Sequence, residues 1–236
     1  MPTVLITGAS RGLGLEFVRQ YAADGWRVLA CARRPEKATE LNAIANDSSA
    51  VRVCALDVTD FAAIDQLSAE LNEEKIDVLI NNAGVFGPMT NESTMPLQDF
   101  EHIDFEAWQS VLLTNTLAPL KMVGAFMPQI VAGSQKKIIT ISSSMGSIAD
   151  AYGGYYLYGS SKAAVNRAMV SLAKDLKDKG ISVALFCPGW VKTDMGGAMA
   201  EITPEQSISG LRERIKDLTL AKTGEYRNYN GDAMSW

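Results

Sequence analysis

The fold is decided by the segment Thr7-Gly8-Ala9-Ser10-Arg11-Gly12-Leu13-Gly14. It follows an apolar run at Val4–Thr7 and leads into an amphipathic segment that ends at Gly25. Glycine lets the backbone turn tightly and approach a pyrophosphate, and the N-terminus of a helix offers unpaired N–H groups and the positive end of its dipole. Three glycines alone are weak evidence, but their position between a strand and a helix predicts a dinucleotide-binding turn.

Outward from this turn, short apolar runs alternate with longer amphipathic segments, which is the pattern of a parallel sheet covered by helices. The runs are nearly unbroken in apolar character, as in strands buried on both faces. The predicted strands are Val4–Thr7, Val28–Ala32, Val51–Leu56, Val78–Asn81, Ile138–Ser142 and Val183–Cys187. The predicted helices are those after Leu13, at Ala62 to Leu71, Trp108 to Met127, Lys162 to Lys179, and 204–220, the last preceded by a capping sequence at Thr203–Gln206.

No linker or repeat interrupts this pattern, so we expect residues 1–236 to form one α/β domain. The predicted fold is a Rossmann-type doubly wound parallel sheet of six or seven strands, with helices on both faces. A loop and helix at 190–220 are expected to serve the substrate, and the glycine- and methionine-rich segment Asp194–Ala200 is expected to be mobile.

Charge and cysteine content bear on partners and location. The formal net charge is -5 with no basic run, which argues against nucleic-acid binding. Three widely spaced cysteines in apolar runs (Cys31, Cys54, Cys187) are typical of buried free thiols in a reducing compartment. There is no signal-peptide pattern, and no apolar stretch approaches the ~20 residues of a membrane span. We expect a cytoplasmic protein that does not contact membranes.

The single histidine excludes two common chemistries. A Ser-His-Asp hydrolase or a histidine-ligated metal site would have to use His102, which lies in a polar stretch without histidine or cysteine neighbours. We interpret His102 as a surface residue and expect no metal site.

Three further motifs, together with the glycine turn, make the resemblance to a known family specific. The glycine turn reads T-G-x-x-x-G-x-G, Asn81-Asn82-Ala83-Gly84 closes the fourth predicted strand, Tyr158 and Lys162 form Y-x-x-x-K, and Pro188-Gly189 follows the sixth strand. In this order they resemble the short-chain dehydrogenases/reductases over practically the whole chain. The resemblance implies a nicotinamide cofactor along Gly8, Ser10, Gly12, Leu13 and Gly14, with Asp57 and Val58 at the adenine, Asn81, Ala83 and Gly84 at the ribose region, and Pro188, Gly189, Val191 and Thr193 toward the nicotinamide amide.

Charge at the end of the second strand predicts which cofactor is bound. An acidic residue there would hold the ribose hydroxyls of NAD and repel a 2′-phosphate. The sequence instead has Ala32-Arg33-Arg34, with Arg11 in the glycine turn. Guanidinium groups suit a phosphate dianion. We therefore expect NADP(H). Arg11 and Arg33 are the first candidates to bind its 2′-phosphate, and Arg34 is the next. The alternative is that the strand-end arginines are merely solvated.

Proton transfer is assigned to Tyr158 and Lys162. The resemblance implies that both also contact the cofactor, with Lys162 at the nicotinamide ribose. An isolated tyrosine titrates near ~10, and a nearby ammonium is expected to lower its pKa. Residues four apart on a helix share one face. Tyr152, Tyr155 and Tyr156 lack a lysine four residues on, so Tyr158 is the predicted general acid.

A serine and an asparagine complete the tetrad that the resemblance implies. One of Ser142, Ser143 and Ser144 is expected to bind the substrate carbonyl, and alignment on Gly146 favours Ser143. Asn115 lies in an apolar helix, where asparagine is unfavourable unless its side chain makes functional polar interactions. Pro119 lacks the N–H that would bond the Asn115 carbonyl, so a bend is expected there. In the family this carbonyl holds a water that links the lysine to solvent.

The expected substrate is a small apolar or aryl ketone or aldehyde, because the residues predicted around it are aromatic and flexible apolar ones. They are Val85, Phe86, Met145, Ile148, Tyr152, Tyr155, Trp190, Met195 and Met199. Within the family, the stretches at 142–148, 153–158 and 224–231 resemble the C-factor-type carbonyl reductases, although Gly159 and Ser235 depart from that subgroup. That resemblance keeps a nucleotide-binding regulator as an alternative function, and reduction of 3-oxoacyl thioesters as another. It also implies a homodimer or homotetramer.

Overall fold

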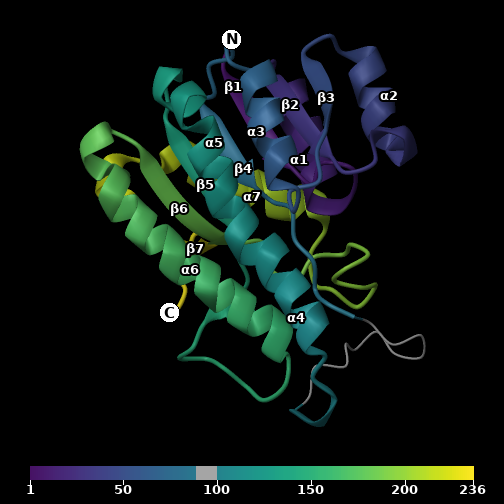
Figure 1. The fold of residues 1–236 in the computed structure, drawn as a ribbon, viewed down its shortest axis with the longest axis vertical. Helices are drawn as coiled ribbons and strands as arrows, with labels where there is room; N and C mark the ends of the chain where they lie inside the picture. Colours follow the sequence, from purple (N-terminus) through teal and green to yellow (C-terminus); the bar gives the residue numbers. More distant parts are fainter. Residues whose placement is uncertain (89–99) are drawn as a thin grey trace.

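The computed structural model describes residues 1–88 and 100–236. Its centre is a seven-stranded sheet in the order β3-β2-β1-β4-β5-β6-β7, with every neighbouring pair parallel (Figure 1). The strands are β1 (Thr3–Thr7), β2 (Arg27–Ala32), β3 (Val51–Ala55), β4 (Val78–Asn81), β5 (Lys137–Ile141), β6 (Ser182–Cys187) and β7 (Tyr226–Asn228). The order reverses between β1 and β4, which is the switch point at which open α/β sheets bind ligands. The predicted fold class is confirmed.

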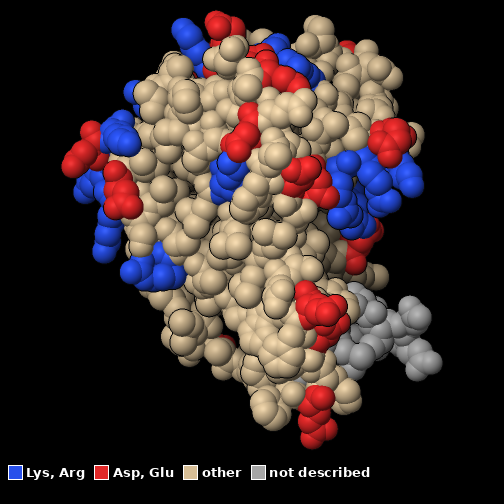
Figure 2. All heavy atoms as spheres, in the orientation of Figure 1, with Lys and Arg blue, Asp and Glu red and all other residues tan. Residues whose placement is uncertain are grey.

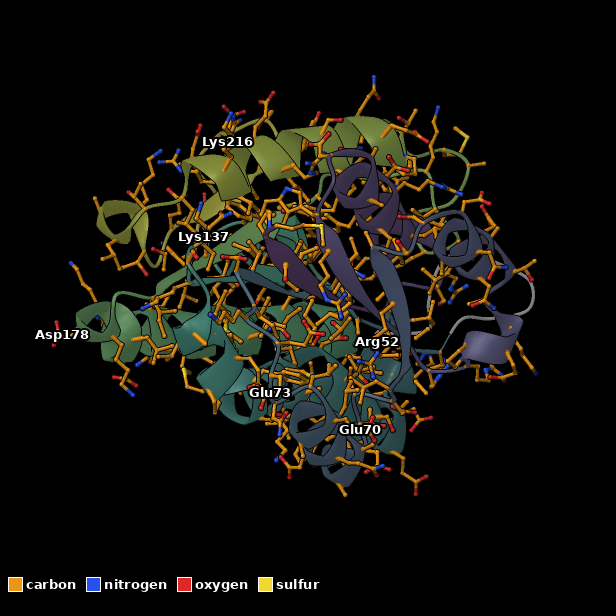
Figure 3. The ribbon with its side chains drawn as sticks, turned by 90° about the horizontal axis from the view of Figure 1, so that it is seen from above. Arg52, Glu70, Glu73, Lys137, Asp178 and Lys216 are labelled. Carbon is orange, nitrogen blue, oxygen red and sulfur yellow. The ribbon has the colours of Figure 1, made fainter. Side chains whose placement is uncertain are left out.

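Helices cover both faces of the sheet (Figure 3). One layer holds α1 (Gly12–Ala23), α2 (Thr39–Asp47) and α7 (Pro204–Asp217). The other holds α3 (Phe61–Glu70), α4 (Phe105–Leu112), α5 (Ala118–Ala132) and α6 (Tyr156–Leu176). Within β1, Val4 and Ile6 belong to the core beneath the first layer, and Leu5 belongs to the core beneath the second. Burial on both faces explains the unbroken apolar runs.

The third strand departs from that expectation. In β3, Val51 and Cys54 are buried, whereas Arg52 and Ala55 are exposed. β3 is an edge strand, so it is covered by a neighbouring strand on one side only and its burial is incomplete.

Two elements were not predicted individually. Helix α2 buries only Leu41, and β7 has three residues, of which only Tyr226 is buried. The predicted cap of α7 is confirmed, because the Thr203 side chain accepts from Gln206 N and the Gln206 side chain accepts from Thr203 N.

The helical run Phe105–Ala132 corrects the expectation about apolar length. By length and composition this run is long and apolar enough to cross a membrane, although one such helix is weak evidence and core helices pass the same test. Of its most apolar window, 44% is buried inside the protein. Less than half of this window is packed inside the protein, so burial accounts for only part of its apolar character.

Candidate active site

The glycine turn follows β1 and packs against the residues that follow β4. Gly8 has φ +67°, and a Cβ there would lie 2.8 Å from Ala83 Cα; a Cβ at Gly14 would lie 2.1 Å from the Gly8 oxygen. Asn82 holds this close approach, since its Nδ2 donates to Thr7 O (2.9 Å) and Gly8 O (3.2 Å). The Thr7 hydroxyl accepts from Asn82 N and Ala83 N at 3.0 and 3.1 Å. The two motifs therefore form one turn.

This turn forms one wall of a cleft of about 290 Å³ at the carboxyl ends of the strands. The cleft brings together most of the predicted cofactor residues. They are Gly8, Ser10, Arg11, Gly12, Leu13, Gly14, Arg33, Asp57, Val58, Ala83, Gly84, Tyr158, Lys162, Pro188 and Thr193. Arg34, Asn81, Gly189 and Val191 do not line it. Residues that were not predicted to bind the cofactor also line it: Leu56, Thr59, Asn82, Thr114, Ile141, Ser142 and Asp194.

The two arginines that line the cleft, Arg11 and Arg33, have different surroundings. Arg33 lines the cleft, and its charge helps to lower the pKa of Asp57; burial alone would raise that pKa, but hydrogen bonds from Thr59 and the charge of Arg33 outweigh it. Arg11 forms an ion pair with Asp194 (Nη1 to Oδ2, 2.6 Å), and both side chains are 75% exposed. On the face of the molecule drawn in Figure 2, acidic and basic side chains are interspersed, with a group of basic ones on the side where α2 lies. Arg33 is thus the arginine best placed for an anion in the cleft.

Tyr158 and Lys162 lie on one face of α6, both nearly buried at 7% and 5% exposure. Lys162 Nζ donates to Ile141 O (2.9 Å) and lies 5.5 Å from the centroid of the Tyr158 ring. The helix therefore brings the two side chains together, as their spacing predicts.

The predicted effect of Lys162 on Tyr158 is not the dominant one in this structure. Burial raises the pKa of Tyr158 above its ordinary value, and a hydrogen bond with Ser143 offsets only part of that rise. Burial also lowers the pKa of Lys162 to about 8. The expectation that Tyr158 would have a lowered pKa is thus corrected: both groups are buried, and desolvation disfavours both charged forms.

The structure distinguishes the three serines. Ser143 shares a side-chain hydrogen bond with Tyr158. Ser142 Oγ donates instead to Asn166 Oδ1 at 2.5 Å, and the Ser144 side chain bonds to the Cys187 thiol. Of the three hydroxyls, that of Ser143 lies beside the phenol.

Asn115 lies in a π-helical turn, Leu113–Leu117, between α4 and α5. The predicted bend before Pro119 thus takes the form of a widened turn, a common way to accommodate a missing N–H. The Asn115 side chain accepts from Val85 N (2.9 Å) and donates to Val85 O (2.8 Å) and Ser161 Oγ (3.0 Å). It therefore ties the segment that follows β4 to α6, at the residue next to Lys162.

The nine predicted pocket residues are distributed over several places. Val85 and Met195 line the main cleft. Phe86 stacks on Tyr158. Met145, Ile148, Tyr152 and Tyr155 line a second cavity of about 250 Å³, which also includes Gly159, Ser160 and Ala163 of α6. Trp190 and Met199 are 51% and 82% exposed and line neither cavity. Within the described residues, no group of three His, Cys, Asp or Glu side chains is placed to hold a metal ion.

Comparison with known proteins agrees with this architecture. The short chain dehydrogenase family matches residues 2–203, and the chain belongs to that family. The NADPH-bound carbonyl reductase from chicken fatty liver is similar over 100% of this chain and 99% of its own, with TM-score 0.89 and 32% identity. The carbonyl reductase Sniffer of D. melanogaster is similar over 100% of both chains, with TM-score 0.91 and 30% identity. The C-signal protein of Myxococcus xanthus is 36% identical over 162 residues, 68% of this chain and 93% of its own. The chain is an oxidoreductase of this family by fold and by relationship.

Proposed function

We propose that the protein is an NADPH-dependent reductase of small apolar ketones or aldehydes. One observation carries the proposal: Tyr158, which lines the cleft, shares a hydrogen bond with Ser143, and Lys162 is buried beside the Tyr158 ring. A ketone that receives hydride develops negative charge on oxygen and needs a nearby acid and hydrogen-bond donor. These three side chains supply both.

The cleft fits a phosphorylated dinucleotide. Backbone approach at Gly8 and Gly14 is too close for any side chain, and the turn runs into the N-terminus of α1, where N–H groups favour an anion. Arg33 lies in the cleft where β2 ends, and no acidic residue directly follows that strand. Carbonyl reductases of similar structure that hold NADP or NADPH add support. When bound, NADPH would supply the hydride to the carbonyl carbon.

The residues of the chain have separate roles in this proposal. Tyr158 donates its proton to the substrate oxygen, and the Ser143 hydroxyl donates a hydrogen bond to the same atom. The Lys162 ammonium stabilises the tyrosinate that remains. The Asn115 side chain holds α6 against the segment that follows β4, through its hydrogen bonds with Val85 and Ser161. We assign to its main-chain carbonyl the binding of a water molecule that links Lys162 to solvent, by which Tyr158 regains its proton.

A regulatory role is the second candidate, because the chain resembles the C-signal protein over 68% of its length. A protein that only bound the nucleotide would not need a buried Tyr158–Lys162 pair with Ser143 beside it. Catalysis is therefore the function we propose, in the cytoplasm and as a homo-oligomer.

The test is the oxidation of NADPH, followed by absorbance, with a panel of aryl ketones, aldehydes and 3-oxoacyl thioesters. NADH is run in parallel. We expect turnover of at least one apolar carbonyl and a preference for NADPH. Tight NADPH binding without turnover of any carbonyl would favour the regulatory role, and turnover of thioesters alone would change the substrate class.

A further inference from the structure

The short strand β7 contacts the turn at residues 142–146, which carries Ser143. β7 pairs with β6, with Tyr226 opposite Leu185, and Tyr226 is only 3% exposed. Its hydroxyl donates a hydrogen bond to the main-chain oxygen of Ser143. A residue 83 positions away in the sequence therefore holds the backbone of the serine whose hydroxyl lies beside Tyr158.

Asn166 of α6 holds the same turn from another side. Its Oδ1 accepts from Ser142 Oγ (2.5 Å), and its Nδ2 donates to Gly146 O (3.3 Å). Burial raises the pKa of Tyr226 to about 12, while hydrogen bonds with Ser142 and Asn166 oppose that rise. The phenol of Tyr226 thus stays protonated over the neutral range and remains a hydrogen-bond donor.

Trp236 completes this support. Its ring packs on that of Tyr226, with centroids 5.2 Å apart and planes at 43°. Its main-chain oxygen accepts from Ala149 N (2.9 Å) and from Ser147 Oγ (3.4 Å). The segment from Tyr226 to Trp236 therefore contacts both ends of the loop that begins at Ser143.

We propose that Tyr226 is a positioning residue for carbonyl reduction: its hydroxyl fixes the Ser143 backbone, so that the Ser143 hydroxyl points at the substrate oxygen beside Tyr158. The inference rests on the proposed function. The rate gained from a catalytic hydrogen bond depends steeply on the positions of its atoms. A small shift of Ser143 is therefore expected to lower kcat while the free energy of unfolding changes little. Cofactor binding should not change, because Tyr226 does not line the cleft.

The test is a double-mutant cycle between Tyr226→Phe and Ser143→Ala. Tyr226→Phe removes one hydroxyl and keeps the ring. We expect kcat to fall by roughly tenfold with an unchanged KM for NADPH. In the Ser143→Ala background the same substitution should change the residual kcat by less than about twofold, because coupled residues are not additive. Tyr229→Phe is the matched control, since its hydroxyl has no hydrogen bond within the described part of the chain.

A second measurement separates this inference from the proposed function. Amide hydrogen exchange of residues 142–149, followed by mass spectrometry, should become faster in Tyr226→Phe and in Trp236→Leu but not in Tyr229→Phe. Wild-type kcat in Tyr226→Phe, an equal loss in the Ser143→Ala background, or unchanged exchange would each overturn the positioning role. If Tyr226→Phe does not fold, Trp236→Leu takes its place in the cycle. A wild-type protein inert to every carbonyl would instead overturn the proposed function.

Discussion

The ring of Phe86 stacks on the ring of Tyr158, with centroids 4.4 Å apart and an interplanar angle of 28°. Phe86 follows the Asn-Asn-Ala-Gly motif by two positions. The segment after β4 therefore both packs closely against Gly8 of the glycine turn and supplies the ring that covers Tyr158. The stack contributes to the burial of the phenol, and this burial raises the pKa of Tyr158.

Removal of this ring is predicted to slow reduction. Aromatic pairs contribute about 0.5–1.5 kcal/mol beyond their buried area, which corresponds to roughly two- to tenfold in rate. We expect Phe86→Leu to lower kcat by that factor, because Tyr158 becomes free to turn away from the substrate oxygen. Phe105→Leu, at a phenylalanine that is 66% exposed, is the control. A kcat for Phe86→Leu equal to that of the control would show that the stack has no role in turnover.

Arg33 is predicted to set the preference for NADPH. A hydrogen bond to a charged group contributes about 1.5–3 kcal/mol, so Arg33→Ala should weaken NADPH binding by roughly ten- to a hundredfold and leave NADH binding nearly unchanged. Calorimetry or fluorescence titration gives both Kd values. Arg34→Ala is the neighbouring comparison, because Arg34 does not line the cleft. A larger loss in Arg34→Ala than in Arg33→Ala would contradict the assignment.

The ion pair between Arg11 and Asp194 is predicted to oppose NADPH binding. Exposed pairs contribute only about 0–1 kcal/mol, so breaking this one costs little stability. Asp194→Asn removes a negative charge from the cleft and releases Arg11. We expect the Kd for NADPH to fall by roughly two- to fivefold, within that energy range, with a smaller change for NADH. Weaker NADPH binding in Asp194→Asn would mean that the pair supports the bound state.

The rate of reduction is predicted to fall as the pH rises through about 8. Burial lowers the pKa of Lys162 to about 8 from its ordinary 10.5, so the ammonium is lost near that pH. Tyr158 has a raised pKa and stays protonated there, so it does not limit the rate. The acid side of the profile should be flat and the alkaline limb should fall by about tenfold per pH unit. In Lys162→Arg the side chain keeps its positive charge to higher pH, so the alkaline limb of the pH–rate profile should move to higher pH. A limb at the same pH in both proteins would exclude Lys162 as its source.

Lys137 is predicted to stabilise the end of α7. Its Nζ donates to Ile215 O (2.8 Å) and Lys216 O (3.0 Å), and Figure 3 shows Lys137 below α7 on the same side as Lys216. Lys137→Met leaves both carbonyls without this donor, so the free energy of unfolding should fall by about 1–3 kcal/mol. Lys216→Met, at an exposed position, should change it by less than about 0.5 kcal/mol. Urea unfolding measures both, and equal values for the two variants would refute the role of Lys137.

Local patterns in the sequence were enough to predict most of the sheet. Unbroken apolar runs marked six strands, and spacing alone put Tyr158 beside Lys162. The short strand β7 had no such signal, because only Tyr226 is buried in it. Helix α2 buries only Leu41, so its periodicity was equally weak.

Contacts between distant elements escaped prediction for a different reason. Asn82 bonds to Thr7 across 75 positions, and Tyr226 bonds to Ser143 across 83. Nothing in the local sequence at either end indicates its partner. The pKa of Tyr158 was likewise misjudged, because the spacing of Lys162 is visible in the sequence but the depth of burial is not.

The central claim is that Tyr158 delivers the proton to the substrate oxygen. The most direct test compares kcat for NADPH-dependent reduction in the wild type, Tyr158→Phe and Tyr156→Phe, with the Kd for NADPH measured in each. We predict that Tyr158→Phe loses at least about a hundredfold in kcat with a nearly unchanged Kd, and that Tyr156→Phe, on the same helix, stays close to wild type. Near-wild-type turnover by Tyr158→Phe with every carbonyl tested would contradict the mechanism.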